Sequence, residues 1–173
     1  MKALVVYESM YGNTRTIAEA IGSGLGAHAD VVPVREAAPD QLAIVELLVV
    51  GGPTHVRGLS QPATRQAARD AAGKPGSTLT LESDAGEFGL REWFASLGSL
   101  SCQAAAFDTR VDMPAIFAGR ASVGIARLLR SHGAQPVTPV HSFRVDKQNH
   151  LLEAEYVRAH AWGKDLARAV RPT

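Results

Sequence analysis

Residues 2–14 read Lys2-Ala3-Leu4-Val5-Val6-Tyr7-Glu8-Ser9-Met10-Tyr11-Gly12-Asn13-Thr14, and this stretch decides the fold. Its first half is a continuous apolar run, which is typical of a parallel strand covered on both faces. Its second half is rich in hydroxyl and amide groups and leads into a helical pattern. Free N–H groups in the first turn of a helix, together with the helix dipole, favour an anion. The junction therefore predicts a phosphate site, with Ser9, Asn13 and Thr14 as side-chain donors.

Strand-like and helix-like patterns alternate along the rest of the chain. Further strands are predicted at residues 31–34, 47–50, 104–107 and 140–145, the last with the alternation of an edge strand. Helices are predicted at residues 17–25, 92–100, 124–131 and 152–170. This alternation favours an α/β fold, a doubly wound five-stranded parallel sheet of order 2-1-3-4-5 with helices on both faces. We expect residues 1–173 to form one domain, with a ligand beyond the carboxyl ends of strands one and three.

The composition excludes several classes of protein. Lysine and arginine total 18 against 17 acidic residues, so no large positive field for nucleic acid is expected. A single cysteine, Cys102, rules out an internal disulfide and suits a reducing compartment. No apolar run approaches the roughly 20 residues of a membrane helix. We expect a cytoplasmic protein with no membrane span, and the spacing of its histidines predicts no metal site.

The pattern Ser9-x-Tyr11-Gly12-x-Thr14 resembles the phosphate loop of flavodoxins, which usually reads Ser/Thr-x-Thr-Gly-x-Thr. Tyr11 departs from that form. The resemblance implies the flavodoxin-like fold and flavin mononucleotide (FMN) as cofactor. It also implies that the FMN phosphate is bound by Ser9, Met10, Tyr11, Gly12, Asn13 and Thr14.

The resemblance further implies that the loops after the third and fourth strands flank the flavin ring. The residues expected there are Pro53, Thr54, His55, Val56, Arg57 and Gly58 in one loop, and Asp108, Thr109, Arg110, Phe117 and Gly119 in the other. The family commonly stacks a tyrosine or tryptophan on the ring, and here only Phe117 could do so. Aromatic pairs contribute about 0.5–1.5 kcal/mol beyond burial, so weaker FMN binding is expected. For His55, contact with the ring, proton donation during flavin reduction and simple solvation all remain open.

Two classes of function follow. One is an FMN-binding redox protein, either an electron carrier with a redox partner protein or a small flavin-dependent oxidoreductase of quinone or protoporphyrinogen type. The near-neutral charge lacks the acidic surplus of typical flavodoxins, which weakens the carrier version. The other class is a flavodoxin-like module that has lost FMN and acts as a binding or regulatory protein, which the missing stacking aromatics favour.

Residues 58–89 form a long polar segment that a minimal version of this fold does not need. A helix is expected at residues 64–72 and an extended stretch at 77–81, and the segment is either a mobile lid or a tethered surface excursion. Its acidic residues Glu82, Asp84 and Glu87 are expected to be solvated. The sequence Gly22-Ser23-Gly24-Leu25-Gly26-Ala27 matches a dinucleotide fingerprint, but it ends a helix instead of following a strand. We interpret Gly22 and Gly24 as packing or fraying positions.

Overall fold

The computed structural model describes residues 1–83, 85–86 and 88–170. Its centre is one parallel sheet with the order β2-β1-β3-β4-β5, and β6 also pairs with β4. The strands are β1 Ala3–Tyr7, β2 Ala29–Pro33, β3 Leu47–Pro53, β4 Gln103–Val111, β5 Gln135–Pro136 and β6 His141–Val145. The predicted order 2-1-3-4-5 is confirmed. The acidic residues Asp84 and Glu87 of the predicted solvated loop lie outside the described residues.

The fifth position of the sheet is filled by two strand segments instead of one. β5 pairs with the start of β4, and β6 pairs with its end from Phe107 to Val111. Pro136 and Pro139 lie at and after the break. Because proline lacks the N–H that a ladder needs, these two residues interrupt the edge strand.

The helices are α1 Asn13–Leu25, α2 Pro39–Leu42, α3 Pro62–Ala72, α4 Leu90–Ser96, α5 Ala115–Ala118, α6 Ala121–Ser131 and α7 Glu155–Ala169, with a 3-10 turn η1 at Val34–Glu36. The helix predicted at 64–72 is confirmed as α3. The helix predicted at 92–100 begins earlier and ends at Ser96, because Leu97 has an extended backbone. Residues 77–82 have no regular secondary structure.

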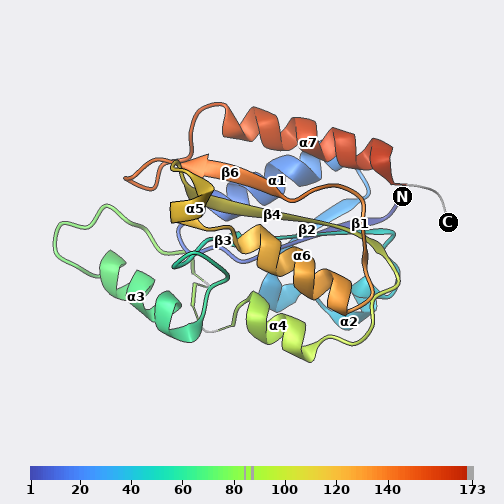
Figure 1. Ribbon diagram of the computed structural model, residues 1–173, viewed down its shortest axis with the longest axis horizontal. Helices are drawn as coiled ribbons and strands as arrows, with labels where there is room; N and C mark the ends of the chain where they lie inside the picture. The colour runs from blue at the N-terminus through green and yellow to red at the C-terminus, as the bar shows by residue number, and fades with distance from the viewer. Residues whose placement is uncertain (84, 87, 171–173) are drawn as a thin grey trace.

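The helices cover the sheet in two layers, which Figure 1 shows edge-on. Helices α1 and α7 pack on one face, where Ile17, Ile21 and Leu166 join Val5 and Val49 in a buried cluster. Helices α4 and α6 lie over the other face, where the buried cluster includes Trp93, Phe94, Ile125 and Leu129. Both faces of the central strands are therefore apolar, as their continuous sequence pattern predicts.

The contact between α1 and α7 depends on glycine. A Cβ atom on Gly24 would lie 2.1 Å from the carbonyl oxygen of His160, and one on Gly163 would lie 2.3 Å from the carbonyl oxygen of Ile21. These distances leave no room for a side chain. The backbone contact supports the interpretation of Gly24 as a packing position and not part of a dinucleotide site.

Helices α3 and α5 lie outside the two layers, beyond the end of the sheet to which the strand arrows point (Figure 1). In parallel strands that end carries the loops after β1, β3, β4 and β6. Among the described residues, no helix is long and apolar enough to cross a membrane.

Candidate functional site

The loop between β1 and α1 turns at Gly12. Gly12 has a left-handed backbone with φ of 91°, and its N–H donates to Ser9 Oγ at 3.1 Å. Because left-handed backbone strains other residues, the glycine is required at this position. Ser9 is 8% exposed, and its hydroxyl thus shapes the loop from within.

Helix α1 begins at Asn13 without a side-chain cap and without an acidic residue in its first turn. The first backbone bond at this end runs from Thr16 N–H to the Gly12 carbonyl, at 2.9 Å. The N–H groups before Thr16 lie ahead of the helical ladder, as in any helix start. N–H groups of this kind, together with the positive end of the helix dipole, favour an anion.

The side chains of Asn13 and Thr14 connect this loop to two other loops. Asn13 Nδ2 donates to the carbonyl oxygen of Asn149, at 2.7 Å. The Thr14 hydroxyl lies 2.7 Å from the hydroxyl of Thr109, with which it shares a buried hydrogen bond. Asn149 follows β6 and was missing from the predicted site, because nothing near it in sequence marks it as a ligand. Both predicted donors thus have protein partners in this structure.

The loop after β3 closes in a tight turn at His55–Gly58. The N–H and carbonyl groups of His55 and Gly58 bond to each other at 2.8 and 2.9 Å. Val56 and Arg57 between them both have positive φ, at 42° and 73°. Such a conformation resembles a type I′ turn and is rare for a β-branched residue. Strain of this kind typically costs about 1–3 kcal/mol and is found where function or packing requires it.

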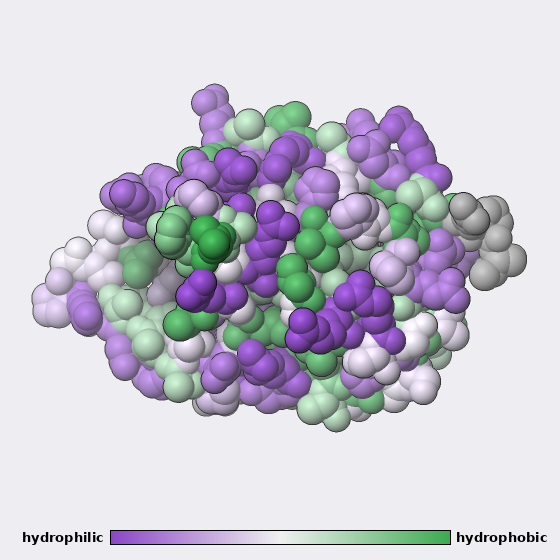
Figure 2. All heavy atoms as spheres, in the orientation of Figure 1, coloured by the Kyte–Doolittle hydropathy of each residue, from purple (hydrophilic) through white to green (hydrophobic). Residues whose placement is uncertain are grey.

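This turn packs against the loop after β4. The Arg57 guanidinium donates to the carbonyl oxygen of Ile116 at 2.7 Å. A Cβ atom on Gly119 would lie 2.2 Å from the backbone of Arg57, so only glycine allows this approach. Phe117 is 68% exposed and Val56 is 83% exposed. Figure 2 shows the resulting apolar surface over α5, at the edge where a flavin ring was expected.

His55 lies in the wall of the cavity between these loops. Burial lowers the pKa of its imidazole, while the charge of Glu8 and contact with the Thr64 backbone act in the opposite direction. The lowered pKa favours the neutral ring at physiological pH. The His55 side chain is half-buried.

Asp108 and Thr109 point to opposite faces of β4, as neighbours in a strand must. Thr109 faces Thr14, whereas Asp108 is fully buried beneath α6. One carboxylate oxygen of Asp108 accepts the N–H and the hydroxyl of Ser122, at 2.8 and 2.6 Å. Burial raises the pKa of this carboxyl. Asp108 thus holds the start of α6, a role that its place in the sequence did not indicate.

Arg110 is 7% exposed and supports the turn after β4. Its guanidinium donates to the Met113 carbonyl at 2.6 Å, and its Nε has no partner within the described part of the chain. Burial lowers the pKa of Arg110, and the charge of Asp108 opposes that shift. A buried cation beside the cavity is well placed to influence any charge that develops there.

The four loops enclose a cavity of about 110 Å³. Its walls are formed by Met10, Tyr11, Asn13, Thr14, Pro53, Thr54, His55, Thr109, Arg110, Val111, Val145 and Asn149. The structure thus brings together three groups of predicted residues that are far apart in sequence, and it adds Val111, Val145 and Asn149. A larger open hollow of about 560 Å³ lies at the opposite edge of the sheet, away from these loops.

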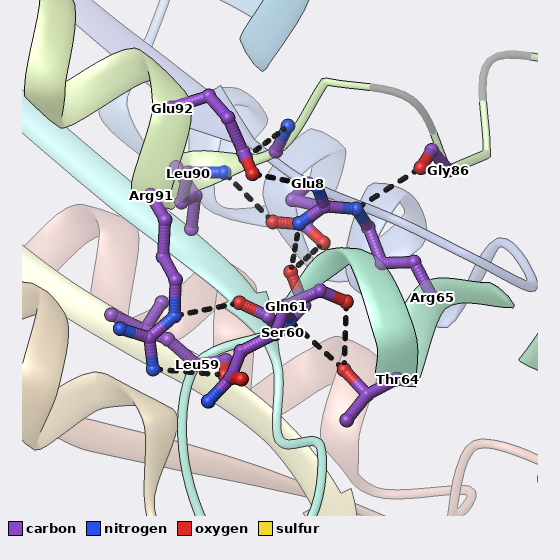
Figure 3. Close-up of polar contacts among 11 residues, drawn as sticks. Glu8, Leu59, Ser60, Gln61, Thr64, Arg65, Gly86, Leu90, Arg91 and Glu92 are labelled. Atoms are coloured by element: carbon purple, nitrogen blue, oxygen red, sulfur yellow. Dashed lines mark hydrogen bonds and ion pairs between the residues drawn. The ribbon is translucent and has the colours of Figure 1, made fainter. Parts of the chain in front are cut away.

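The segment after this site is held by a buried polar network around Arg65 (Figure 3). Arg65 has no exposed surface and donates to Ser60 Oγ at 3.0 Å and to Glu92 at 2.8 Å. Glu8, 5% exposed, accepts the Ser60 hydroxyl and, at 2.9 Å, the N–H of Leu90. Since Glu8 directly precedes the phosphate loop, residues 58–89 are tied to the end of β1. These contacts agree with the tethered alternative for the segment.

The same segment also contacts the phosphate loop directly. The Tyr11 hydroxyl donates to the carbonyl oxygen of Ala68 in α3, at 2.8 Å. The N–H of Glu82 donates to the Met10 carbonyl at 2.9 Å, and its carboxylate pairs with Arg15 at 3.1 Å. Tyr11 departs from the usual motif, and its hydroxyl provides one of these connections. Among the described residues, no group of three or more acidic, histidine or cysteine side chains could hold a metal ion.

Comparisons with known proteins agree on one family. A family model described as Flavodoxin matches residues 5–107, more than half of the chain. A flavodoxin from the domain Archaea aligns over 98% of this chain and 99% of its own, with 22% identity and a TM-score of 0.65. A WrbA-like flavodoxin from Agrobacterium tumefaciens aligns over 98% and 99%, with 17% identity and a TM-score of 0.60. At these identities the structures show a shared fold, and a search of curated proteins gave no match.

Proposed function

The chain belongs to the flavodoxin family, and from this membership we propose that it is an FMN-binding redox protein that uses the cavity at the carboxyl edge of its sheet. Members of this family bind FMN. The observation that carries the proposal is the uncapped start of α1, which follows a left-handed Gly12 and adjoins the cavity. It is the part of the site whose chemistry selects a phosphate.

The phosphate end of the site fits FMN more closely than the ring end does. Ligand pockets usually measure about 300–1,000 Å³, and the cavity measures about 110 Å³. We infer that these loops move apart when FMN binds, so that Thr14 and Asn13 exchange their hydrogen bonds to Thr109 and Asn149 for hydrogen bonds to the ligand. Both pairs are held by single hydrogen bonds, each typically contributing about 0.5–1.5 kcal/mol. Phosphate binding can offset a cost of this size.

When bound, FMN supplies reversible electron-transfer chemistry. The residues of the chain bind and orient it. The α1 start holds the phosphate, and the His55–Gly58 turn and the loop with Phe117 flank the ring. Val56 and Phe117 give the ring an apolar edge, whereas Arg57 and Arg110 place positive charge near it. The neutral imidazole of His55 lies in the same wall.

We propose that electrons pass at this edge to a redox partner protein or a small-molecule acceptor. The apolar side chains over α5 are exposed, so either kind of acceptor could contact the site from this side (Figure 2). A carrier and a small oxidoreductase of quinone type differ in one assay. Only the oxidoreductase sustains catalytic quinone reduction when purified protein, FMN, a nicotinamide reductant and the quinone are the sole components.

The small cavity favours a second candidate, a module of this family that binds a partner without FMN. One experiment separates it from the flavoprotein. Purified protein is titrated with FMN while visible absorption and flavin fluorescence are recorded. Saturable binding supports the flavoprotein. Absence of binding at FMN concentrations up to the millimolar range contradicts it and leaves the module.

A further inference from the structure

Glu82 brings a carboxylate against the phosphate loop from the segment between α3 and α4. A Cβ atom built on Gly12 would lie 2.9 Å from Glu82 Oε1, so the carboxylate stands directly over this glycine. The other oxygen, Oε2, pairs with Arg15 at 3.1 Å. The side chain is 12% exposed. A negative group thus lies beside the helix start that favours an anion.

The backbone of Glu82 is held in place independently of its side chain. Its N–H donates to the Met10 carbonyl at 2.9 Å, and its carbonyl accepts the N–H of Ala85 at 3.1 Å. The main chain around Glu82 is therefore anchored to the phosphate loop itself. The side chain can leave Gly12 by rotation while these backbone contacts remain.

The Glu82 carboxylate also alters the charge of the site. Arg15 is the cation nearest to the loop in sequence, and it pairs both with Glu82 and with Glu19, the latter at 3.7 Å. Glu19 is 59% exposed on the helix surface, and water screens its charge. Glu82 is nearly buried, so its charge acts on the loop with less screening. A phosphate that enters the loop meets this carboxylate as a like charge.

We propose that Glu82 lowers the affinity of the phosphate site: a phosphate group must displace its carboxylate from Gly12 and take over its pairing with Arg15. The proposal rests on the proposed function, since FMN supplies the phosphate. A phosphomonoester can compensate for the displacement because it carries more charge than a carboxylate and has three acceptor oxygens. Riboflavin lacks the phosphate and cannot compete for Arg15. Glu82 thereby lowers affinity for every phosphate ligand.

The test compares Glu82→Gln with the matched control Glu19→Gln. Each variant removes one acidic partner of Arg15, but only the first removes the charge over Gly12. Wild type and both variants are titrated with FMN, riboflavin and inorganic phosphate, by fluorescence for the flavins and by phosphorus NMR for phosphate. We expect Glu82→Gln to bind FMN roughly five- to tenfold more tightly, to bind inorganic phosphate more tightly, and to bind riboflavin as wild type does. Glu19→Gln should match wild type throughout.

Several results would overturn the proposal. The proposal is wrong if Glu82→Gln is folded by circular dichroism and binds FMN no more tightly than wild type. It is also wrong if Glu82→Gln gains the same affinity for FMN and for riboflavin, because the effect would then not act on the phosphate. Glu82→Asp gives a second variant, in which the shorter side chain withdraws the charge and should produce a smaller gain for FMN.

Failure of the proposed function is distinguishable from failure of this inference. If neither wild type nor any variant binds a flavin, the flavoprotein proposal is wrong. The titration with inorganic phosphate then tests the role of Glu82 by itself. Tighter phosphate binding by Glu82→Gln than by Glu19→Gln then supports the inference. Equal phosphate binding by the two variants contradicts it.

Discussion

The hydroxyl groups of Thr14 and Thr109 lie 2.7 Å apart and join the first turn of α1 to the end of β4. Thr14 is 2% exposed and Thr109 is 5% exposed, so water does not reach this hydrogen bond readily. Both side chains line the cavity. A ligand that extends from the phosphate loop to the β4 loop must therefore meet this pair.

Replacement of Thr14 or Asn13 should weaken FMN binding. In Thr14→Ala and Asn13→Ala we expect a loss of about 1 kcal/mol each, because a donor at the helix start is removed. Thr14→Ala should also lower the free energy of unfolding by about 1 kcal/mol, since Thr109 loses its buried partner. Flavin titration and urea unfolding measure the two effects. Thr14→Ser retains the hydroxyl and should keep the FMN affinity and the free energy of unfolding of wild type. If both alanine variants bind FMN as tightly as wild type, the phosphate binds elsewhere.

FMN should bind more tightly than riboflavin. The N–H groups at the start of α1 have a partner in the FMN phosphate and none in riboflavin, and unpaired buried donors cost about 1–3 kcal/mol each. A fluorescence titration with both flavins, at the same pH and ionic strength, measures the difference. Equal affinity for the two ligands would contradict a phosphate site at α1.

Arg65→Met should destabilise the protein strongly. The change leaves the buried Glu8 without the charge of Arg65 nearby and removes the ion pair with Glu92, and loss of one member of a buried pair typically costs about 3–5 kcal/mol. Urea unfolding measures this cost. Arg168→Ala is the control, because its ion pair with Asp165 is exposed and should contribute under about 1 kcal/mol. Limited proteolysis should cut Arg65→Met first within residues 58–89. Similar free energies of unfolding for Arg65→Met and Arg168→Ala would show that the Arg65 network does not hold this segment.

Arg57→Gln and Arg110→Gln should each lower the reduction potential of bound flavin. A cation within about 4–6 Å favours the negative charge that reduction adds to the ring, so removing it disfavours reduction. After screening we expect about 1 kcal/mol, or roughly 40 mV for a one-electron step. Spectroelectrochemical titration gives the potentials. The shift in Arg57→Gln should shrink at high salt because Arg57 is exposed, while the buried Arg110 should respond less to salt. Unchanged potentials in both variants would show that neither side chain acts on the ring.

Stability should fall as the pH drops through about 6.5. Burial lowers the pKa of His55 and His141 in the folded protein, so the unfolded chain takes up protons first as the solution is acidified. For His141, the charge of Arg158 adds to the lowering, and Glu155 and Asp165 oppose it. His141→Phe retains the stacking on Trp162 and should lose less stability than wild type between pH 7.5 and 5.5 in urea unfolding. An identical pH slope in wild type and His141→Phe would exclude His141 as a source.

The sequence by itself determined the sheet order and the place of the phosphate loop. Continuous apolar strands and four-residue helical steps arise from short-range sterics and from burial on one or both faces. The loop after β1 could also be predicted from the sequence, because it depends on neighbouring residues: Gly12, with a left-handed backbone, directly precedes an uncapped helix. Asp108 was predicted to lie in the site, but neighbouring residues of a strand face opposite sides, so its side chain lies beneath α6 while that of Thr109 faces Thr14.

Only the tertiary structure decided the contacts between residues far apart in the chain. Tyr11 reaches Ala68, Arg65 reaches Glu92, and Glu82 stands over Gly12, and no local pattern indicates any of these pairs. The physical reason is that a buried polar group without a hydrogen-bond partner is costly, and tertiary packing decides which partner lies close to it. The sequence therefore determined where the site lies, and the packing of residues 58–89 against β1 decided which charges surround it.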